Sequence, residues 1–196
     1  MPKLLPPATR AIVVANALVY FFYFLLGPAF LNRLALWPRG VPWFQWWQML
    51  TYSFVQISLL HLLVNMAVLI FLGRSLERLW GARNYLLYYF SCVFAAAGIW
   101  LVWAAVTAYP TSTAGASGGV FGLLLAYAIV DPRAPVIEGV RHVPRWLFVL
   151  LFGTLELLLG VFDPHAGVAH FAHLGGMVGG AIVIAFWGTA KPAPRR

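Results

Sequence analysis

The sequence predicts an all-α, polytopic membrane protein, and both its composition and its long apolar runs indicate this fold class. Hydrophobic residues make up 62% of the 196-residue chain and charged residues only 9%, and the mean hydropathy is +0.84. Soluble domains are about 45–50% apolar and about 25% charged, which excludes an ordinary soluble protein. The length leaves room for about six helices of roughly 20 residues each, joined by short loops.

The apolar runs predict a single membrane domain over residues 1–196. Pro28, Pro110 and Pro132 lie at or just outside the ends of these runs, where a missing backbone N–H does little harm. The predicted spans, numbered one to six in chain order, lie near 10–27, 58–77, 83–106, 116–131, 144–161 and 169–188.

The basic residues predict how these spans are oriented. Eleven of the 13 lysines and arginines lie on one side of the membrane if both termini are cytoplasmic, and only Arg33 and Arg39 lie on the other. The net charge of +8 is spread over several loops, which is typical of membrane topology, and we expect no nucleic-acid partner. Charge on short loops favours a bacterial plasma membrane, with the lipid bilayer as the surrounding medium.

The first loop, about residues 28–57, is rich in tryptophan. Tryptophan prefers the headgroup region, so we expect this loop to lie half-sunk in the outer leaflet. Its end, residues 51–58, is polar enough to hold water near the membrane surface. The four tryptophans are Trp37, Trp43, Trp46 and Trp47.

Three groups of polar residues lie inside the predicted spans, where polar side chains are costly and usually paired or functional. His61 and Asn65 are four residues apart and therefore share one helix face. Ser117 lies among glycines where a polar loop enters span four, and His170 and His173 begin span six. A serine at a helix start lies beside amide groups that no intrahelical carbonyl satisfies.

Counting along the helices places these groups at one depth. Ser117 lies 14 residues before Asp131, and His173 lies 14 residues before Trp187, which is about 21 Å of helix in each case. Asn65 lies 13 residues before the basic residue at the inner end of span two, or about 20 Å. All three groups are therefore expected some 10 Å beneath the outer interface of a ~30 Å core.

Small residues four apart predict a close crossing of spans four and six. Gly118 and Gly122 form one such pair, and Gly176 and Gly180 form the other. Small residues at this spacing allow two membrane helices to approach closely. The crossing would bring Ser117 within reach of the histidine on span six.

This arrangement predicts acyl-transfer chemistry by a serine and a histidine. His173 would take the hydroxyl proton of Ser117, which would attack a carbonyl carbon. His61, Asn65 and the Ser117 backbone amide would donate to the oxyanion. Phe121, one turn after Ser117, could pack on the imidazole. Because no span offers an obvious aspartate to orient the histidine, the sequence predicts a dyad, with no cofactor and no metal.

The chain resembles the rhomboid intramembrane serine proteases over essentially its whole length. The resemblance implies a compact six-transmembrane-helix bundle and hydrolysis of peptide bonds in or near transmembrane segments of membrane proteins. It also implies that Ser117 is the nucleophile, His173 the general base, and His61 and Asn65 the oxyanion donors. Glu77 would have a structural role in organising nearby loop and helix ends. The matching motifs are His61-x-x-x-Asn65, Gly73-x-x-x-Glu77, Trp80-Gly81, Gly115-x-Ser117-Gly118 and Ala172-His173-x-x-Gly176-x-x-x-Gly180.

Three positions depart from the usual pattern of that family. Gln48 replaces a common arginine and Gln56 a frequent histidine, and both concern how the first loop is held and hydrated. Phe121 stands where tyrosine is frequent, which is a mild change.

Less specific interpretations exist for each polar residue. A serine among glycines can be a packing residue, and an intramembrane histidine can bond a backbone carbonyl. His170 and His173, with His61 as a third ligand, could bind a metal, although no cysteine or carboxylate completes the set. Glu156, inside span five, is interpreted as a protonated or water-exposed carboxyl near the outer interface. A role at the edge where a substrate helix enters is the second hypothesis.

Two rival functions remain for the whole chain. A catalytically inactive relative that binds membrane helices would be expected to lack the serine or the histidine, and this chain has both. A small transporter would need broken or charged midplane helices in repeated halves, which the sequence does not contain.

Overall fold

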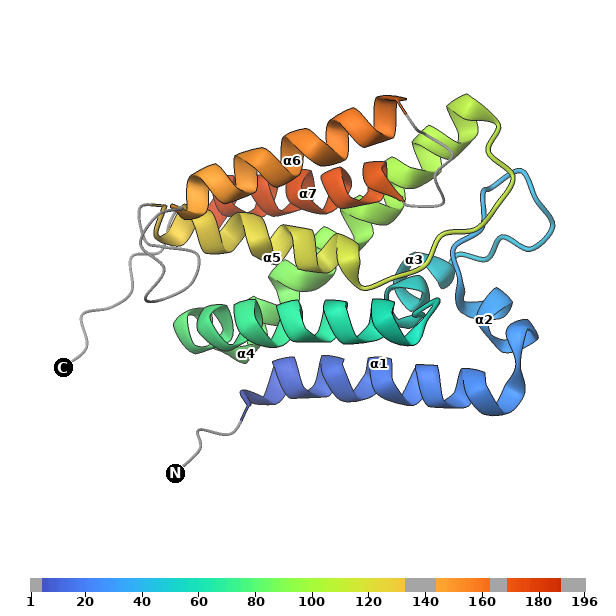
Figure 1. Cartoon of the computed structure of the whole chain (residues 1–196), viewed down its shortest axis with the longest axis horizontal. Helices are drawn as coiled ribbons and strands as arrows, with labels where there is room; N and C mark the ends of the chain where they lie inside the picture. The colour runs from blue at the N-terminus through green and yellow to red at the C-terminus, as the bar shows by residue number, and fades with distance from the viewer. Residues whose placement is uncertain (1–4, 133–143, 163–168, 188–196) are drawn as a thin grey trace.

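The computed structural model describes residues 5–132, 144–162 and 169–187. Several basic residues used for the predicted orientation lie outside these ranges: Lys3, residues 133 and 141, and those of the C-terminal tail. Residue 188 of predicted span six also lies outside them. The all-α prediction is confirmed (Figure 1). The elements are α1 (Pro7–Leu26), α2 (Pro28–Leu34), α3 (Gln48–Thr51), a 3-10 turn η1 (Tyr52–Phe54), α4 (Leu59–Thr107), α5 (Ser117–Val130), α6 (Arg145–Phe162) and α7 (His170–Trp187).

Helix α4 contains both predicted spans two and three, divided by a kink at Gly81. An unbroken helix of 49 residues would be about 73 Å long, more than twice the thickness of a bilayer core. Gly81 has φ 76° and ψ 160°, a conformation that breaks the helix and that glycine adopts without steric cost. The two arms of α4 leave this kink in different directions (Figure 1).

Four of the helices, α1, α4, α6 and α7, are long and apolar enough to cross a membrane. Helix α5 is apolar but has only 14 residues, about 21 Å. The helices lie where the apolar runs predict them, whereas the number of membrane crossings and the single-domain assignment remain predictions.

The core of the bundle lies between α4, α5 and α7. Tyr88 and Cys92 of α4 and Leu123 of α5 are fully buried there. Helices α1 and α6 occupy opposite edges of the bundle (Figure 1). Most side chains of α6 are exposed, and it buries only Val149, Glu156 and Gly160, as expected for a helix that faces lipid.

The first loop is held by Gln48. Its Oε1 accepts hydrogen bonds from the backbone N–H groups of Trp37 and Gln45, at 3.3 and 3.1 Å. Its Nε2 donates to the backbone carbonyls of Arg33 and Trp43, at 3.3 and 3.0 Å. The glutamine thus supplies both donors and acceptors to the loop. Trp43, Trp46 and Trp47 are exposed, and their embedding in the outer leaflet remains a prediction.

Glu77 joins the C-terminal end of the first arm of α4, before the kink, to the start of α1. Its Oε1 accepts from Ala8 N at 2.9 Å, and its Oε2 accepts from Thr9 N and Thr9 Oγ1, both at 2.7 Å. The first turn of a helix has N–H groups without intrahelical acceptors and carries partial positive charge. The buried carboxylate therefore caps α1 and fixes it against α4.

We expect Glu77→Gln to lower the free energy of unfolding by about 2 kcal/mol, because an amide cannot accept all three hydrogen bonds and its NH2 group opposes an N–H donor. Thermal unfolding in detergent measures this change. Arg78→Gln, a neutralisation at the exposed neighbouring residue, is the matched control and should melt close to the unmodified protein. Equal melting temperatures for the two variants would contradict the capping role.

Candidate active site

Ser117 is the first residue of α5, and the segment before it is tied to the first loop. Thr113 and Leu36 exchange two backbone hydrogen bonds of 2.9 Å, and Gly115 N donates to Tyr52 O at 3.0 Å. Gly115 has φ 139°, and a Cβ at this position would lie 2.9 Å from Cε1 of His61. Glycine is therefore required for the chain to pass beneath that ring and enter the helix at the serine.

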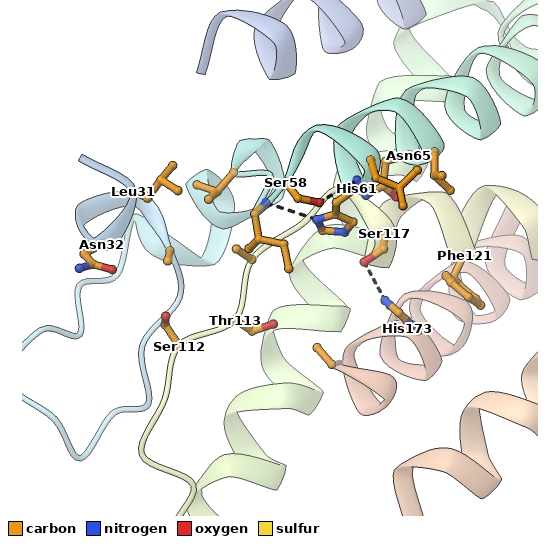
Figure 2. Close-up of a pocket in the computed structure, with 17 residues that line it drawn as sticks. Leu31, Asn32, Ser58, His61, Asn65, Ser112, Thr113, Ser117, Phe121 and His173 are labelled. Atoms are coloured by element: carbon orange, nitrogen blue, oxygen red, sulfur yellow. Dashed lines mark hydrogen bonds between the residues drawn. The ribbon is translucent and has the colours of Figure 1, made fainter. Parts of the chain in front are cut away.

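Ser117 and His173 are in hydrogen-bond contact, 2.7 Å from Oγ to Nε2 (Figure 2). The Phe121 ring stacks on the imidazole, with 4.4 Å between centroids and 6° between planes. Two helices that are far apart in the sequence thus bring together the two residues that the sequence singled out. The contact has the geometry that a nucleophile and its general base require.

The close approach of α5 and α7 makes this contact possible. A Cβ on Gly176 would overlap the backbone carbonyl of Gly118, and one on Gly122 would lie 3.0 Å from the Gly176 carbonyl oxygen. The predicted crossing is therefore present at these three glycines. The predicted place of Gly180 in it is wrong, because the α carbon of Gly180 faces Tyr88 and Cys92 of α4.

His61 lies in the first turn of α4 with a defined ring orientation. Ser58 caps this turn, its Oγ accepting from His61 N at 3.1 Å. Nδ1 of His61 accepts a long hydrogen bond of 3.4 Å from Ile57 N. In a neutral imidazole the other nitrogen then bears the hydrogen, so Nε2 is a donor.

Asn65 ends a chain of side-chain amides that begins in α1. Its Nδ2 donates to Gln56 Oε1 at 3.0 Å, and Gln56 Nε2 donates to Asn16 Oδ1 at 2.8 Å. Nδ2 of Asn16 donates to Ile12 O at 2.9 Å. Asn16 and Gln56 are fully buried, and together they fix the direction of the Asn65 amide. Sequence reasoning missed Asn16, although a lone amide in an apolar span was a usable signal.

Ser117, His173, His61 and Asn65 line one cavity of about 550 Å³ (Figure 2). Residues of α2 and of the segment before α5 complete its wall, among them polar groups that can hold water. The candidate nucleophile, base and oxyanion donors therefore face one space. The polar wall residues outside the predicted site are Asn32, Ser58, Ser112 and Thr113.

Glu156 lies behind His173, and the water-exposed alternative for it and the expected absence of a carboxylate at the histidine are both wrong. Its Oε2 is 2.8 Å from Nδ1 of His173 and 2.7 Å from Nδ1 of His170. It is buried, so it is not a water-exposed carboxyl. A carboxylate therefore does contact the histidine, where the sequence predicted none. Its partners come from a different helix, and helical periodicity within one span does not reveal contacts between spans.

The geometry of this cluster favours hydrogen bonds over metal ligation. Glu156, His170 and His173 place donor atoms within 4.8 Å of one another, and within the described residues His61 does not join them. Ligands of tetrahedral zinc, at about 2.1 Å from the ion, lie about 3.4 Å apart. The observed 2.7 and 2.8 Å are hydrogen-bond lengths.

Comparison with known proteins identifies the family. The sequence model of the Rhomboid domain matches residues 43–189. The chain belongs to the rhomboid family. It is 30% identical over 190 residues to proteins named Rhomboid protease GlpG from Yersinia pestis (strain Pestoides F) and Yersinia pseudotuberculosis serotype O:3 (strain YPIII), and 31% identical to that from Serratia proteamaculans (strain 568). These matches cover 95% of this chain and 64% of the length of each relative.

This rhomboid is an integral membrane protein, and two glutamines stand where its sequence departs from the pattern that the resemblance implies. Gln48 bonds four backbone groups of the first loop, and Gln56 supplies the acceptor for Asn65. Both substitutions therefore keep hydrogen-bonding side chains at structurally demanding places. Phe121 stacks on the imidazole without a hydroxyl group.

We expect Gly176→Ala to lower the reactivity of Ser117 toward a fluorophosphonate about 10²-fold, because the added methyl group would push α7 away from Gly118 and misplace the imidazole. The rate of labelling of the full chain in liposomes measures the loss. Gly153→Ala on α6 is the matched control, since its Cβ would lie 3.4 Å from the flexible Met177 side chain. Equal activity of both variants would show that the close approach is not needed.

Proposed function

We propose that this rhomboid is an intramembrane serine protease that hydrolyses peptide bonds in or near transmembrane segments of membrane proteins. The observation that supports it most directly is the 2.7 Å contact between Ser117 Oγ and His173 Nε2. The two side chains line a cavity together with two candidate oxyanion donors. The relatives are named Rhomboid protease GlpG, which agrees with this activity.

In the proposed acylation step, Ser117 Oγ forms a bond to the carbonyl carbon of the substrate while its proton moves to His173 Nε2. The carbonyl electrons move onto oxygen, and the tetrahedral intermediate is an oxyanion. Collapse of this intermediate breaks the C–N bond. The proton on Nε2 passes to the leaving nitrogen, so the amine product departs neutral and Ser117 holds an ester.

Three donors are proposed for the oxyanion. The backbone N–H of Ser117 is at the start of α5, where no intrahelical carbonyl accepts it. The first side-chain donor is the Nε2–H of His61, because Nδ1 of the same ring already accepts from Ile57 N. The second is the hydrogen of Asn65 Nδ2 that is not bonded to Gln56 Oε1. Donors fixed in advance stabilise developing charge without reorganisation.

Hydrolysis of the ester needs water in the cavity. His173 Nε2 removes a proton from that water as its oxygen bonds to the ester carbonyl carbon. The tetrahedral intermediate then collapses, the bond between this carbon and Ser117 Oγ breaks, and Nε2 returns the proton to Oγ as the acid product leaves. No cofactor enters this scheme. A helical substrate hides its carbonyls in its own hydrogen bonds, so segments weakened by glycine or other poor helix formers should be cleaved preferentially.

We place the protein in a bacterial plasma membrane with both termini cytoplasmic. Helix α1 begins and α5 and α7 end on the same side of the bundle (Figure 1). Arg74, Arg78 and Arg83 flank the kink of α4 at Gly81. Arginines gather on the cytoplasmic side of membrane proteins, which puts the start of α5 toward the outer face.

We expect Ser117→Ala to abolish both cleavage of a single-span substrate and labelling by a fluorophosphonate, because the variant lacks the nucleophile. The two signals are measured on the full chain in liposomes. Ser112→Ala, which removes another hydroxyl from the cavity wall, is the matched control and should retain both.

Labelling that persists in Ser117→Ala would move the nucleophile to another residue. A folded, unsubstituted chain that neither labels nor cleaves would support the inactive helix-binding alternative instead.

We expect Asn65→Ala to lower kcat by about 10²-fold to 10³-fold with little change in KM, as for the loss of one oxyanion donor. Gln56→Leu should lower kcat in the same direction, because Asn65 Nδ2 loses its acceptor. Steady-state kinetics with one peptide substrate measure both variants. Asn32→Ala, which changes an amide elsewhere in the cavity wall, should behave like the unsubstituted enzyme; an equal loss there would argue against a specific donor.

A further inference from the structure

Glu156 is one of three residues that α6 buries, and it is the only charged side chain among them. Its Oε2 lies on the side of His173 opposite Ser117, with 2.8 Å to Nδ1, while Nε2 of the same ring is 2.7 Å from Ser117 Oγ. Hydroxyl, imidazole and carboxylate therefore form a line across three helices, α5, α7 and α6. A buried charge placed in a lipid-facing helix needs such partners.

We propose that Glu156 is the positioning residue of the active site, and that it holds His173 in the tautomer that can accept the Ser117 proton. This inference rests on the proposed protease function. A carboxylate at Nδ1 requires the hydrogen on that nitrogen, which leaves the lone pair on Nε2 directed at the hydroxyl. The site would then be a Ser–His–Glu triad in place of a dyad.

Stacking alone cannot supply this choice of tautomer. The Phe121 ring fixes the plane of the imidazole, with 6° between the two planes. A face-to-face contact, however, is nearly the same for either tautomer and for a ring turned over in its plane. The hydrogen bond to Oε2 distinguishes Nδ1 from Nε2, so it adds the information that the stacking contact lacks.

The carboxylate also bears on the transition state. When the proton of Ser117 reaches Nε2, the ring becomes a cation with both nitrogens protonated. Glu156 then faces this cation across the Nδ1–H bond and remains unprotonated, because the proton continues from Nε2 to the leaving nitrogen. Charge that forms only during the reaction is stabilised most in a site with little water.

A purely structural role is the alternative, since the same oxygen also contacts His170 Nδ1 at 2.7 Å. Both histidines belong to α7, so in this alternative the carboxylate does no more than attach α6 to α7. A substitution of His170 distinguishes the two roles. His170→Phe keeps a ring of similar size and removes one of the two bonds, while the contact between Glu156 and His173 remains.

The first measurement is NMR spectroscopy of the full chain with ¹⁵N-labelled histidine, in detergent. We expect His173 to carry its hydrogen on Nδ1, with a strongly downfield proton resonance that persists in His170→Phe and moves in Glu156→Gln. Loss of the signal in His173→Asn assigns it. Finding the hydrogen on Nε2 in the unsubstituted protein overturns the proposal, and this result does not depend on whether the protein cleaves anything.

The second measurement is the kinetics of peptide cleavage in liposomes. We expect Glu156→Gln to lower kcat about 10²-fold with KM nearly unchanged, because proton transfer is impaired and substrate binding is not. Glu156→Asp, which restores a carboxylate on a shorter side chain, should recover part of the loss. Thr154→Val, an isosteric change at an exposed residue of α6, is the matched control and should cleave at the normal rate.

Two kinetic outcomes would refute the positioning role: normal kcat in Glu156→Gln, or an equal fall of kcat in His170→Phe and Glu156→Gln. Either would leave the protease function standing.

If the unsubstituted chain fails to cleave or label, the protease function fails, and the ¹⁵N spectrum still decides the tautomer. If Glu156→Gln does not fold, the spectrum of the unsubstituted protein and the kinetics of Glu156→Asp decide instead.

Discussion

The close approach of α5 and α7 determines where the hydroxyl and the imidazole of the site lie relative to each other. At Gly176 the two helices meet backbone to backbone, with no room for a Cβ beside the Gly118 carbonyl. Ser117 directly precedes that carbonyl, and His173 lies nearly one turn before Gly176. The separation of the helices therefore sets the 2.7 Å between hydroxyl and imidazole. Small residues in membrane helices are usually explained by packing, and here the packing also places reacting atoms.

Several polar side chains buried in this bundle are satisfied by hydrogen bonds that connect the outer helices to its centre. Asn16 on α1 is connected through Gln56 to Asn65, and Glu156 on α6 contacts His173. Glu77 adds a third link between α4 and α1. In lipid an unsatisfied polar group is costly, so each such bond restricts how a helix can sit. The helices with the most exposed apolar surface are thus the ones that orient the site.

Features governed by local sequence could be predicted, and features governed by contacts between helices could be predicted only in part. Apolar runs predicted the positions of the helices, and glycine spacing predicted the helix crossing that brings Ser117 to His173. The same spacing misplaced Gly180, because it cannot tell which of two neighbouring helices a glycine faces. The contact of Glu156 with the two histidines was missed for a related reason. Its partners lie 14 and 17 residues along the chain on another helix, where no periodicity relates them.

The short length of α5 is consistent with the proposed cleavage of a segment inside a membrane. A helix of 14 residues covers about 21 Å, so with one end at a membrane interface the other stops well inside a ~30 Å core. The remaining depth is filled by the segment that pairs with the first loop through Thr113 and Leu36, and Thr113 lines the cavity with Ser112 and Asn32. A helix of full spanning length would carry the serine to the surface, out of reach of residues embedded in lipid.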